Sequence, residues 1–165
     1  MKRRAFLLSA LGVAGALVVG WGVLPPRGRL GDSSLLPLSG GQAALNGWVK
    51  IDVDGGASVA VPRAEMGQGV HTALPMLVAE ELDLPLARVR IAEAPFDAIY
   101  GNVAGFVALL PFHPLAREGA LFKSTAWVTA KLARELGIIV TGGSSSVADA
   151  WEVMRMAGAA ARAAL

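Results

Sequence analysis

The chain contains no cysteine among its 165 residues. Disulfide bonds, cysteine-ligated zinc, cysteinyl iron–sulfur clusters and attached c-type haem therefore cannot form within it. Its two histidines, His71 and His113, stand far apart in the sequence and lack the spacing of a metal-binding pair. We therefore expect no metal ligated by side chains, and any electron transfer needs a partner or a non-covalent cofactor.

A surplus of positive charge is also absent beyond the first residues. Lys2, Arg3 and Arg4 supply three of the fifteen basic residues, which leaves twelve basic against thirteen acidic residues in the remainder. Proteins that bind nucleic acid usually present a basic patch. The distribution of charge thus predicts no nucleic-acid partner.

One long apolar run is present, from Ala5 to Leu24, and it contains no charged residue. Arg3 and Arg4 precede this run, and together they resemble a twin-arginine export signal. The alternative is an ordinary signal or signal-anchor helix, because about 20 apolar residues can span a bilayer. We predict residues 1–24 as this signal and a periplasmic location, with cleavage or anchoring in the inner membrane both left open.

The rest of the chain divides into an arm and a domain. Residues 25–46 are rich in Gly, Pro and Ser, which is typical of a linker or docking arm. Residues 47–165 show strand-like and helix-like patterns without a regular βαβ rhythm, so we predict an α+β domain with a small mixed sheet. The predicted strands are 48–53, 57–61, 89–93 and 138–140, and the first two are predicted to form a β-hairpin around the turn at 54–56. The predicted helices are 72–82, 121–136, which Gly137 is predicted to end, and 147–165. Residues 94–119 are predicted as loop with one short apolar turn.

The chain is organised around a glycine-rich turn that opens into an apolar helix. Gly67 and Gly69 flank Gln68, and the backbone can approach a ligand closely at residues that carry no Cβ. The first N–H groups of the following helix favour an anionic or hydrogen-bond-accepting group. Thr72 is predicted to cap this helix.

A second turn of the same kind, Thr141 to Ser146, precedes the last helix and contains Gly142 and Gly143. Ser146 and Asp149 have the spacing of a capping box. Two such turns predict one large polar ligand.

The last helix is predicted to bury one apolar stripe. Its small residues at 157–161 allow close approach either by another backbone or by a flat ligand, and both interpretations stay open. Arg155 and Arg162 lie seven residues apart on a common face. The stripe consists of Val147, Trp151, Met154, Gly158 and Ala161.

These motifs resemble a known family. EMGQGVHT at residues 65–72, followed by AEEL at 79–82, is similar to the molybdopterin-binding repeat of the xanthine dehydrogenase and aldehyde oxidase family. The likeness is closer to the exported branch, the beta subunit of isoquinoline 1-oxidoreductase. TGGSSS at 141–146 and the residues to 162 resemble the next element of that subunit, in the expected order, so the resemblance spans nearly the whole chain.

The resemblance implies a molybdenum hydroxylase, an oxidoreductase that inserts oxygen from water into an N-heterocycle or an aldehyde. In this family a molybdenum–molybdopterin cofactor, for which the cytosine dinucleotide form is one option, holds the metal without a protein sulfur ligand. The implied partners are an iron–sulfur small subunit, a downstream electron acceptor such as a cytochrome, and the remainder of the same subunit.

The resemblance also assigns candidate site residues. In the first turn the backbone and the Gln68 amide contact the cofactor, and the second turn cradles its pterin or phosphate end. A helix-start role is the alternative for His71 and Thr72, and simple solvation is the alternative for Arg162. The cofactor-binding candidates are Gly67, Gln68, Gly69, Thr72, Gly142, Gly143, Ser144, Ser146 and Arg162.

Parts of the family pattern are missing. A complete subunit is several times longer, and it carries a further glycine-rich segment with a phenylalanine and a C-terminal glutamate that acts as general base. Glu65, Glu80 and Glu81 are not assigned that role, since nothing in the sequence places them beside the metal. We therefore predict a fragment that is inactive alone and contains no catalytic residue. The alternative is a membrane-tethered binding or assembly module, in which the turns hold another phosphate-bearing ligand or only shape the fold.

Overall fold

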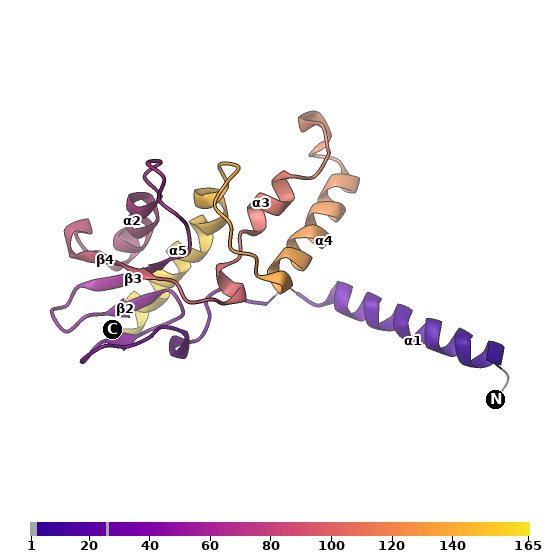
Figure 1. Ribbon diagram of the computed structural model, residues 1–165, viewed down its shortest axis with the longest axis horizontal. Coiled ribbons are helices and arrows are strands. Elements are labelled where there is room, and N and C mark those ends of the chain that lie inside the picture. Colours follow the sequence, from indigo (N-terminus) through magenta and orange to yellow (C-terminus); the bar gives the residue numbers. More distant parts are fainter. Residues whose placement is uncertain (1–2, 26) are drawn as a thin grey trace.

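A four-stranded mixed sheet lies at the end of the molecule opposite the N-terminus, and the predicted α+β class is confirmed (Figure 1). The computed structural model describes residues 3–25 and 27–165, so Lys2 of the predicted signal lies outside the described residues. The strand order is β1-β2-β3-β4, with antiparallel pairing of β1 with β2 and β2 with β3, and parallel pairing of β3 with β4. The strands are β1 (Ala43–Ala44), β2 (Val49–Ile51), β3 (Ala57–Val61) and β4 (Val89–Glu93).

The predicted hairpin and the predicted strand at 89–93 are both present. Strands β2 and β3 are joined by a tight turn in which Gly55 has φ +74°, a conformation that glycine adopts without strain. Helix α2 (Val70–Leu82) connects β3 to β4, and this crossover makes the β3–β4 pair parallel. The first glycine-rich turn lies between β3 and α2, and the second directly precedes α5 (Ser146–Ala164).

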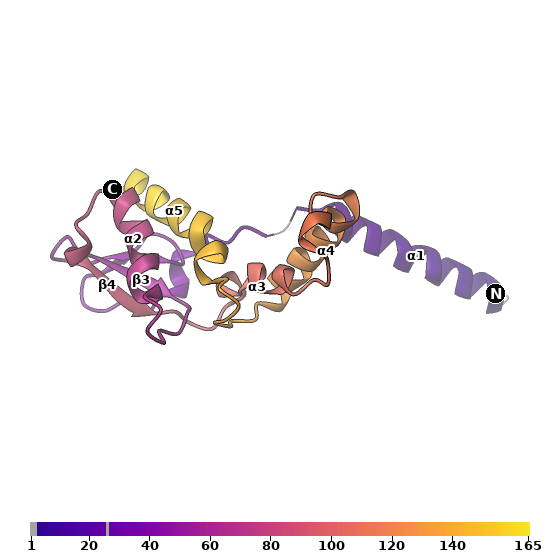
Figure 2. The ribbon, with the colours of Figure 1, turned by 90° about the horizontal axis from the view of Figure 1, so that it is seen from above.

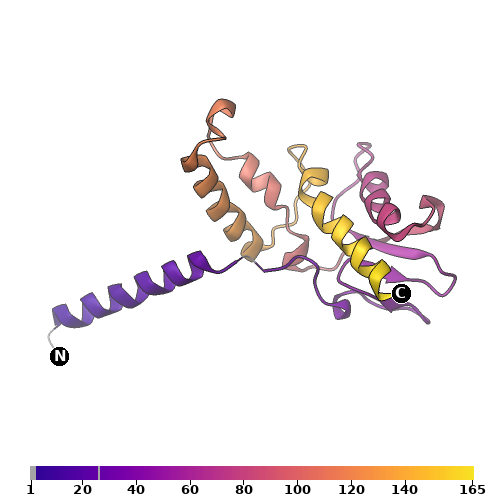
Figure 3. The same cartoon turned by 180° about the vertical axis from the view of Figure 1, so that it is seen from behind.

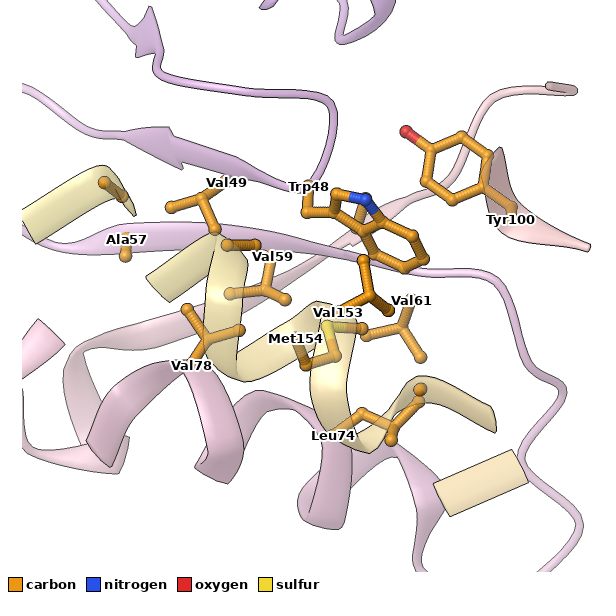
Figure 4. Packing of buried hydrophobic residues seen from close by; sticks show 14 of the residues in the cluster. Trp48, Val49, Ala57, Val59, Val61, Leu74, Val78, Tyr100, Val153 and Met154 are labelled. Carbon is orange, nitrogen blue, oxygen red and sulfur yellow. The ribbon is translucent and has the colours of Figure 1, made fainter. Parts of the chain in front are cut away.

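Helices α2 and α5 (Ser146–Ala164) pack on one face of the sheet (Figures 1 and 3). Figure 4 shows their side chains meeting those of β2 and β3, with Leu74 and Met154 between the layers. Trp48 and Tyr100 close the end of this core, edge to face with ring centroids 4.8 Å apart. All four of these side chains are fully buried.

The last helix buries a different stripe from the predicted one. Val147 and Trp151 are exposed, whereas Met154, Gly158 and Ala161 are buried as expected. The small residues serve helix packing, because a Cβ on Gly158 would lie 2.8 Å from Cβ of Glu81 and 3.0 Å from the carbonyl oxygen of Val78. The face that meets the sheet and α2 consists of Asp149, Ala150, Val153, Met154, Ala157, Gly158 and Ala161.

A helical hairpin projects from the sheet domain (Figure 3). It consists of α3 (Val103–Ala108), which occupies part of the predicted loop, and α4 (Ala120–Leu136), which ends as predicted at Gly137 with φ +59°. The predicted strand at 138–140 is wrong. Its carbonyl groups instead accept hydrogen bonds from Asn102, whose backbone N–H binds Ile138 and whose side chain binds Val140.

The N-terminal helix α1 (Arg3–Val23) extends away from the domain (Figure 2). Within residues 3–25 and 27–165, no helix combines the length and the apolar character needed to cross a membrane. The export signal stays a prediction. The predicted arm lies against the domain, since Leu36 is buried in the core and β1 extends the sheet. Short 3-10 turns at Ser33–Leu35, Leu86–Arg88, Ala98–Tyr100 and Pro114–Ala116 complete the described elements.

Candidate cofactor-binding site

The two glycine-rich turns lie side by side. The backbone N–H of Ala64, at the start of the first turn, donates to Oγ1 of Thr141, at the start of the second, over 2.8 Å. Both turns project from the same side of the molecule, beside the starts of α2 and α5 (Figures 1 and 3). Residues 77 positions apart in the sequence thus share one surface.

The first turn is closed internally by a carboxylate. Oε1 of Glu65 accepts hydrogen bonds from the N–H groups of Gly67 and Gly69, and Oε2 accepts from His71, each over 2.9 Å. These bonds lower the pKa of Glu65 below its ordinary value, because they favour the charged carboxylate, with the His71 bond contributing most. The donors that the sequence offered to an external anion are therefore already engaged.

Gln68 also bonds within the first turn. Its Oε1 accepts from the N–H of Met66 over 2.6 Å, and its Nε2 donates to the carbonyl of Ala64 over 2.8 Å. A carboxamide has two N–H donors and two acceptor lone pairs. One donor and one acceptor of the exposed Gln68 side chain thus remain for a neutral polar ligand.

The second turn is stabilised by hydrogen bonds of two side chains, Ser145 and Asn102. The hydroxyl of Ser145 donates to the carbonyl of Gly142 over 2.7 Å and accepts from Nδ2 of Asn102, also over 2.7 Å. Gly143 has φ +61° and Ser144 has φ +52°, so the chain turns through two left-handed residues before α5. Ser144 is one of only two described non-glycine residues in this region of φ, and Asp83 is the other.

Space in front of both turns is open. A Cβ added to Gly67, Gly69, Gly142 or Gly143 would meet no atom within 4 Å. The glycines of the first turn and Gly143 have positive φ, which explains them by conformation alone. Gly142 has no positive φ, and no contact within the described chain requires glycine there. Close approach of a ligand would account for it.

A pocket of about 230 Å³ opens beside the second turn. Gly142 and Gly143 form one wall, and the opposite wall comes from α3 and the segment that follows α4. Its lining is mainly apolar, which suits a flat ring better than an ion. The lining residues are Asn102, Gly105, Phe106, Leu109, Ile138, Val140, Gly142 and Gly143.

A buried ion cluster supports the second turn, and the sequence analysis missed it. Oδ2 of Asp149 accepts from Arg63 and from Arg29, each over 2.7 Å, while its Oδ1 accepts from the N–H of Ala104. Arg63 and Asp149 are almost fully buried, and burial lowers the pKa of the Arg63 guanidinium. The predicted capping box is wrong, because Asp149 binds these arginines and Ser145, not Ser146, precedes the helix.

The cluster joins four segments of the chain. Arg63 follows β3 and also donates to the carbonyl of Tyr100, and Arg29 of the arm donates to the carbonyls of Ile99, Gly101 and Asp149. The sequence assigned Asp149 only to a capping box and left it outside the predicted buried stripe. The charge of Asp149 did not indicate which basic residues would form ion pairs with it.

Three predicted site residues, Thr72, Ser146 and Arg162, lie on the helices that follow the two turns. Thr72 is exposed in the first turn of α2, which begins at Val70, so its predicted capping role is wrong. Ser146 is the first residue of α5. Arg162 lies 16 residues further along α5, roughly 24 Å at 1.5 Å per residue, and pairs with Asp83 over 3.3 Å. The structure brings together the remaining candidates, Gly67, Gln68, Gly69, Gly142, Gly143 and Ser144.

The sheet, its two covering helices and the paired turns form one domain with an open surface at the turns. The sequence profile of the molybdopterin cofactor-binding domain matches residues 11–104, more than half of the chain. The chain belongs to this family.

Two curated relatives are similar to the chain. The isoquinoline 1-oxidoreductase subunit beta of Brevundimonas diminuta is 39% identical over 103 residues, which cover 62% of this chain and 13% of the relative. The membrane-bound aldehyde dehydrogenase [pyrroloquinoline-quinone] of Gluconacetobacter polyoxogenes is 30% identical over 170 residues, which cover 100% of this chain and 16% of the relative. The chain thus spans about a sixth or less of the length of these relatives. No solved structure is significantly similar to it.

The site fits a molybdopterin in its donor chemistry. The open glycine cradle, the spare amide groups of Gln68 and the apolar pocket beside Gly142 suit a flat polar heterocycle with a long tail. No cluster of three or more side chains that could hold a metal ion occurs in the part of the chain that the structure describes. A metal carried by an organic cofactor needs no such cluster.

Proposed function

We propose that this chain is the cofactor-binding part of an exported molybdenum hydroxylase that oxidises N-heterocycles or aldehydes with oxygen from water. The observation that carries the proposal is the 2.8 Å bond from Ala64 to Thr141, which joins two open glycine-rich turns into one surface. The relatives named for isoquinoline and aldehyde oxidation support the two substrate classes.

The chain's own residues bind and orient the cofactor in this proposal. The backbone of Gly67 and Gly69 and the free amide groups of Gln68 contact one end, and Gly142, Gly143 and Ser144 cradle the other. Thr72, Ser146 and Arg162 would then contribute to the helices that carry the turns. When bound, the cofactor supplies oxygen transfer and accepts the two electrons of the oxidation.

The remaining functions belong to other parts of the assembly. We propose that the rest of the same subunit supplies the general base, because the chain spans 13% to 16% of its relatives. An iron–sulfur subunit and then an acceptor such as a cytochrome would remove the electrons, since this chain has no cysteine to ligate a cluster. Export by the twin-arginine route would place the assembly in the periplasm, with α1 as signal or anchor. The cytosine dinucleotide form of the cofactor would extend along the second turn.

Molybdenum and pterin content tests the proposal. The subunit completed by the following reading frame is to be purified as wild type, Gln68→Ala and Gly142→Val. We expect molybdenum in the wild type and its loss in both variants. Gly142 is preferred to Gly143 because its ordinary φ tolerates a side chain. Gly40→Val, at another open glycine with ordinary φ, is the matched control and is to retain the metal. A completed wild type without molybdenum or pterin would refute the proposal.

One observation favours the rival, a membrane-tethered ligand-binding or assembly module without catalysis. Glu65 and Gln68 satisfy donors of the first turn internally, as expected if that turn only shaped the fold. The rival predicts that Gln68→Ala changes stability and leaves ligand content unchanged. A following reading frame or a neighbouring gene for an eight-cysteine ferredoxin-like subunit favours the enzyme.

A further inference from the structure

The strongest unassigned feature is the carboxylate of Glu65 at the start of α2. Its two oxygens accept three backbone hydrogen bonds, from Gly67, Gly69 and His71, all of 2.9 Å. Backbone N–H groups at the start of a helix are the groups that bind an external anion, and an acidic side chain there is stabilised by the helix dipole. In this protein a side chain of the chain itself takes that place.

The carboxylate also fixes the path of the first turn. Gly67 at φ +92° and Gly69 at φ +81° both turn their N–H groups toward Oε1 of Glu65. Gln68 lies between them, and its side chain closes the loop on the opposite side through Met66 and Ala64. The orientation of Gln68 therefore depends on Glu65.

The second turn differs in charge. Residues 141–146 include no acidic residue, and within the described residues no carboxylate accepts from their N–H groups. An anionic group close to the first turn would meet the negative charge of Glu65, whereas the second turn presents no such charge.

We infer that Glu65 is a positioning residue, which fills the anion site of the first turn and thereby restricts this turn to a neutral part of the ligand. This restriction on the ligand rests on the proposed function, whereas the role of Glu65 in the turn does not.

Amide NMR on the full 165-residue chain tests the role directly. In Glu65→Ala the amides of Gly67, Gly69 and His71 are to exchange at least about tenfold faster, because hydrogen bonds to charged groups are among the stronger ones. Inorganic phosphate is then to shift these three amide resonances saturably in Glu65→Ala and not in the wild type. A merely structural residue would not create a phosphate response. Glu80→Ala, at an exposed glutamate of the same helix, is the control and is to behave as wild type.

The wild-type protein provides a second test, which remains decisive if Glu65→Ala does not fold. In the wild type the same three amide resonances are to follow the titration of the Glu65 carboxyl group. Amides that ignore this titration, or a wild-type first turn that binds phosphate, would overturn the assignment. A completed subunit without molybdenum but with these responses would refute the proposed function alone. A molybdenum-loaded subunit without them would refute the role of Glu65 alone.

Discussion

The two glycine-rich turns resemble each other in sequence and differ in how they are held. The first is held from within, by Glu65 and Gln68 of the turn itself. The second has an internal hydrogen bond from Ser145 to Gly142, but its further support comes from other segments, through Asn102 and the buried cluster around Asp149. A locally held turn depends on a few exposed hydrogen bonds, whereas the second depends on the tertiary structure. Substitutions that remove the support of one turn at a time test this difference.

Removal of the buried carboxylate is expected to have the largest effect. Asp149→Ala leaves Arg63 and Arg29 without their shared partner, and breaking a buried ion pair in this way typically costs about 3–5 kcal/mol. Urea unfolding is to show this loss in the free energy of unfolding. Glu152→Ala, an exposed acid one turn along the same helix, is the control, with an expected change within about 0.5 kcal/mol. Equal effects of the two substitutions would contradict the role of the cluster.

Asn102→Ala is expected to destabilise the protein by about 2 kcal/mol. It removes the buried side chain that donates to Val140 and Ser145 and accepts from the N–H of Gly105, so several partners lose a hydrogen bond. Hydrogen exchange is to rise at Ser145 and Gly105 and to stay unchanged at Gly67. A rise at Gly67 of the same size would show that the two turns are not held separately.

Substitutions of two glycines are expected to change the free energy of unfolding by smaller amounts. Helix packing requires Gly158, whereas no contact within the described chain requires Gly142. Gly158→Ala places a Cβ against Glu81 and the backbone of Val78, so we expect a loss of about 1 kcal/mol although alanine favours helix. Gly142→Ala meets open space and is expected to be nearly neutral in thermal unfolding. If Gly142→Ala destabilised the chain as much as Gly158→Ala, the chain itself and not a ligand would explain that glycine.

Lowering the pH is expected to weaken the hydrogen bonds that hold the first turn and to leave those of the second turn unchanged. Because its hydrogen bonds lower the pKa of Glu65 in the folded protein, the carboxylate stabilises the turn above the unfolded pKa of about 4.3, and this contribution disappears as the pH falls through the lower folded value. The protection of the Gly69 and His71 amides, measured against the intrinsic exchange rate at each pH, is to decrease over that range. Glu65→Gln removes this change in protection, and Ser145 serves as the internal reference. Protection at Gly69 that stays constant between pH 5 and 2 would contradict the prediction, in a window of about three pH units set by the ordinary pKa of a carboxyl.

Local patterns predicted most of the elements. The hairpin around Asp54, the strand at 89–93 and the helix ended by Gly137 are all confirmed, since alternation, turn residues and a left-handed glycine act within a few residues. The predicted strand at 138–140 is absent because an apolar segment forms a strand only beside another strand. The carbonyl groups of this segment instead accept hydrogen bonds from Asn102.

The sequence predicted that helices α2 and α5 exist, but it predicted the first residue of α2 and the buried face of α5 incorrectly. The start of α2 lies at Val70 because Glu65, five residues before it, accepts the first N–H groups, whereas Thr72 was the local candidate. The buried face of α5 is rotated toward Asp149 because two arginines from distant segments meet it there. Arg162 shares the helix of the second turn but lies at its far end.

The sequence by itself determined the two glycine-rich turns, the α+β class and the membership of a molybdopterin-binding family, because these depend on residues adjacent in the chain. The tertiary structure alone decided that the turns meet through Ala64 and Thr141, that Arg63 and Asp149 form a buried pair, and which face of α5 is covered. The physical reason is that the partners in these contacts lie far apart along the chain. A hydrogen bond across 77 residues, or an ion pair across 86, leaves no periodic signature in the sequence.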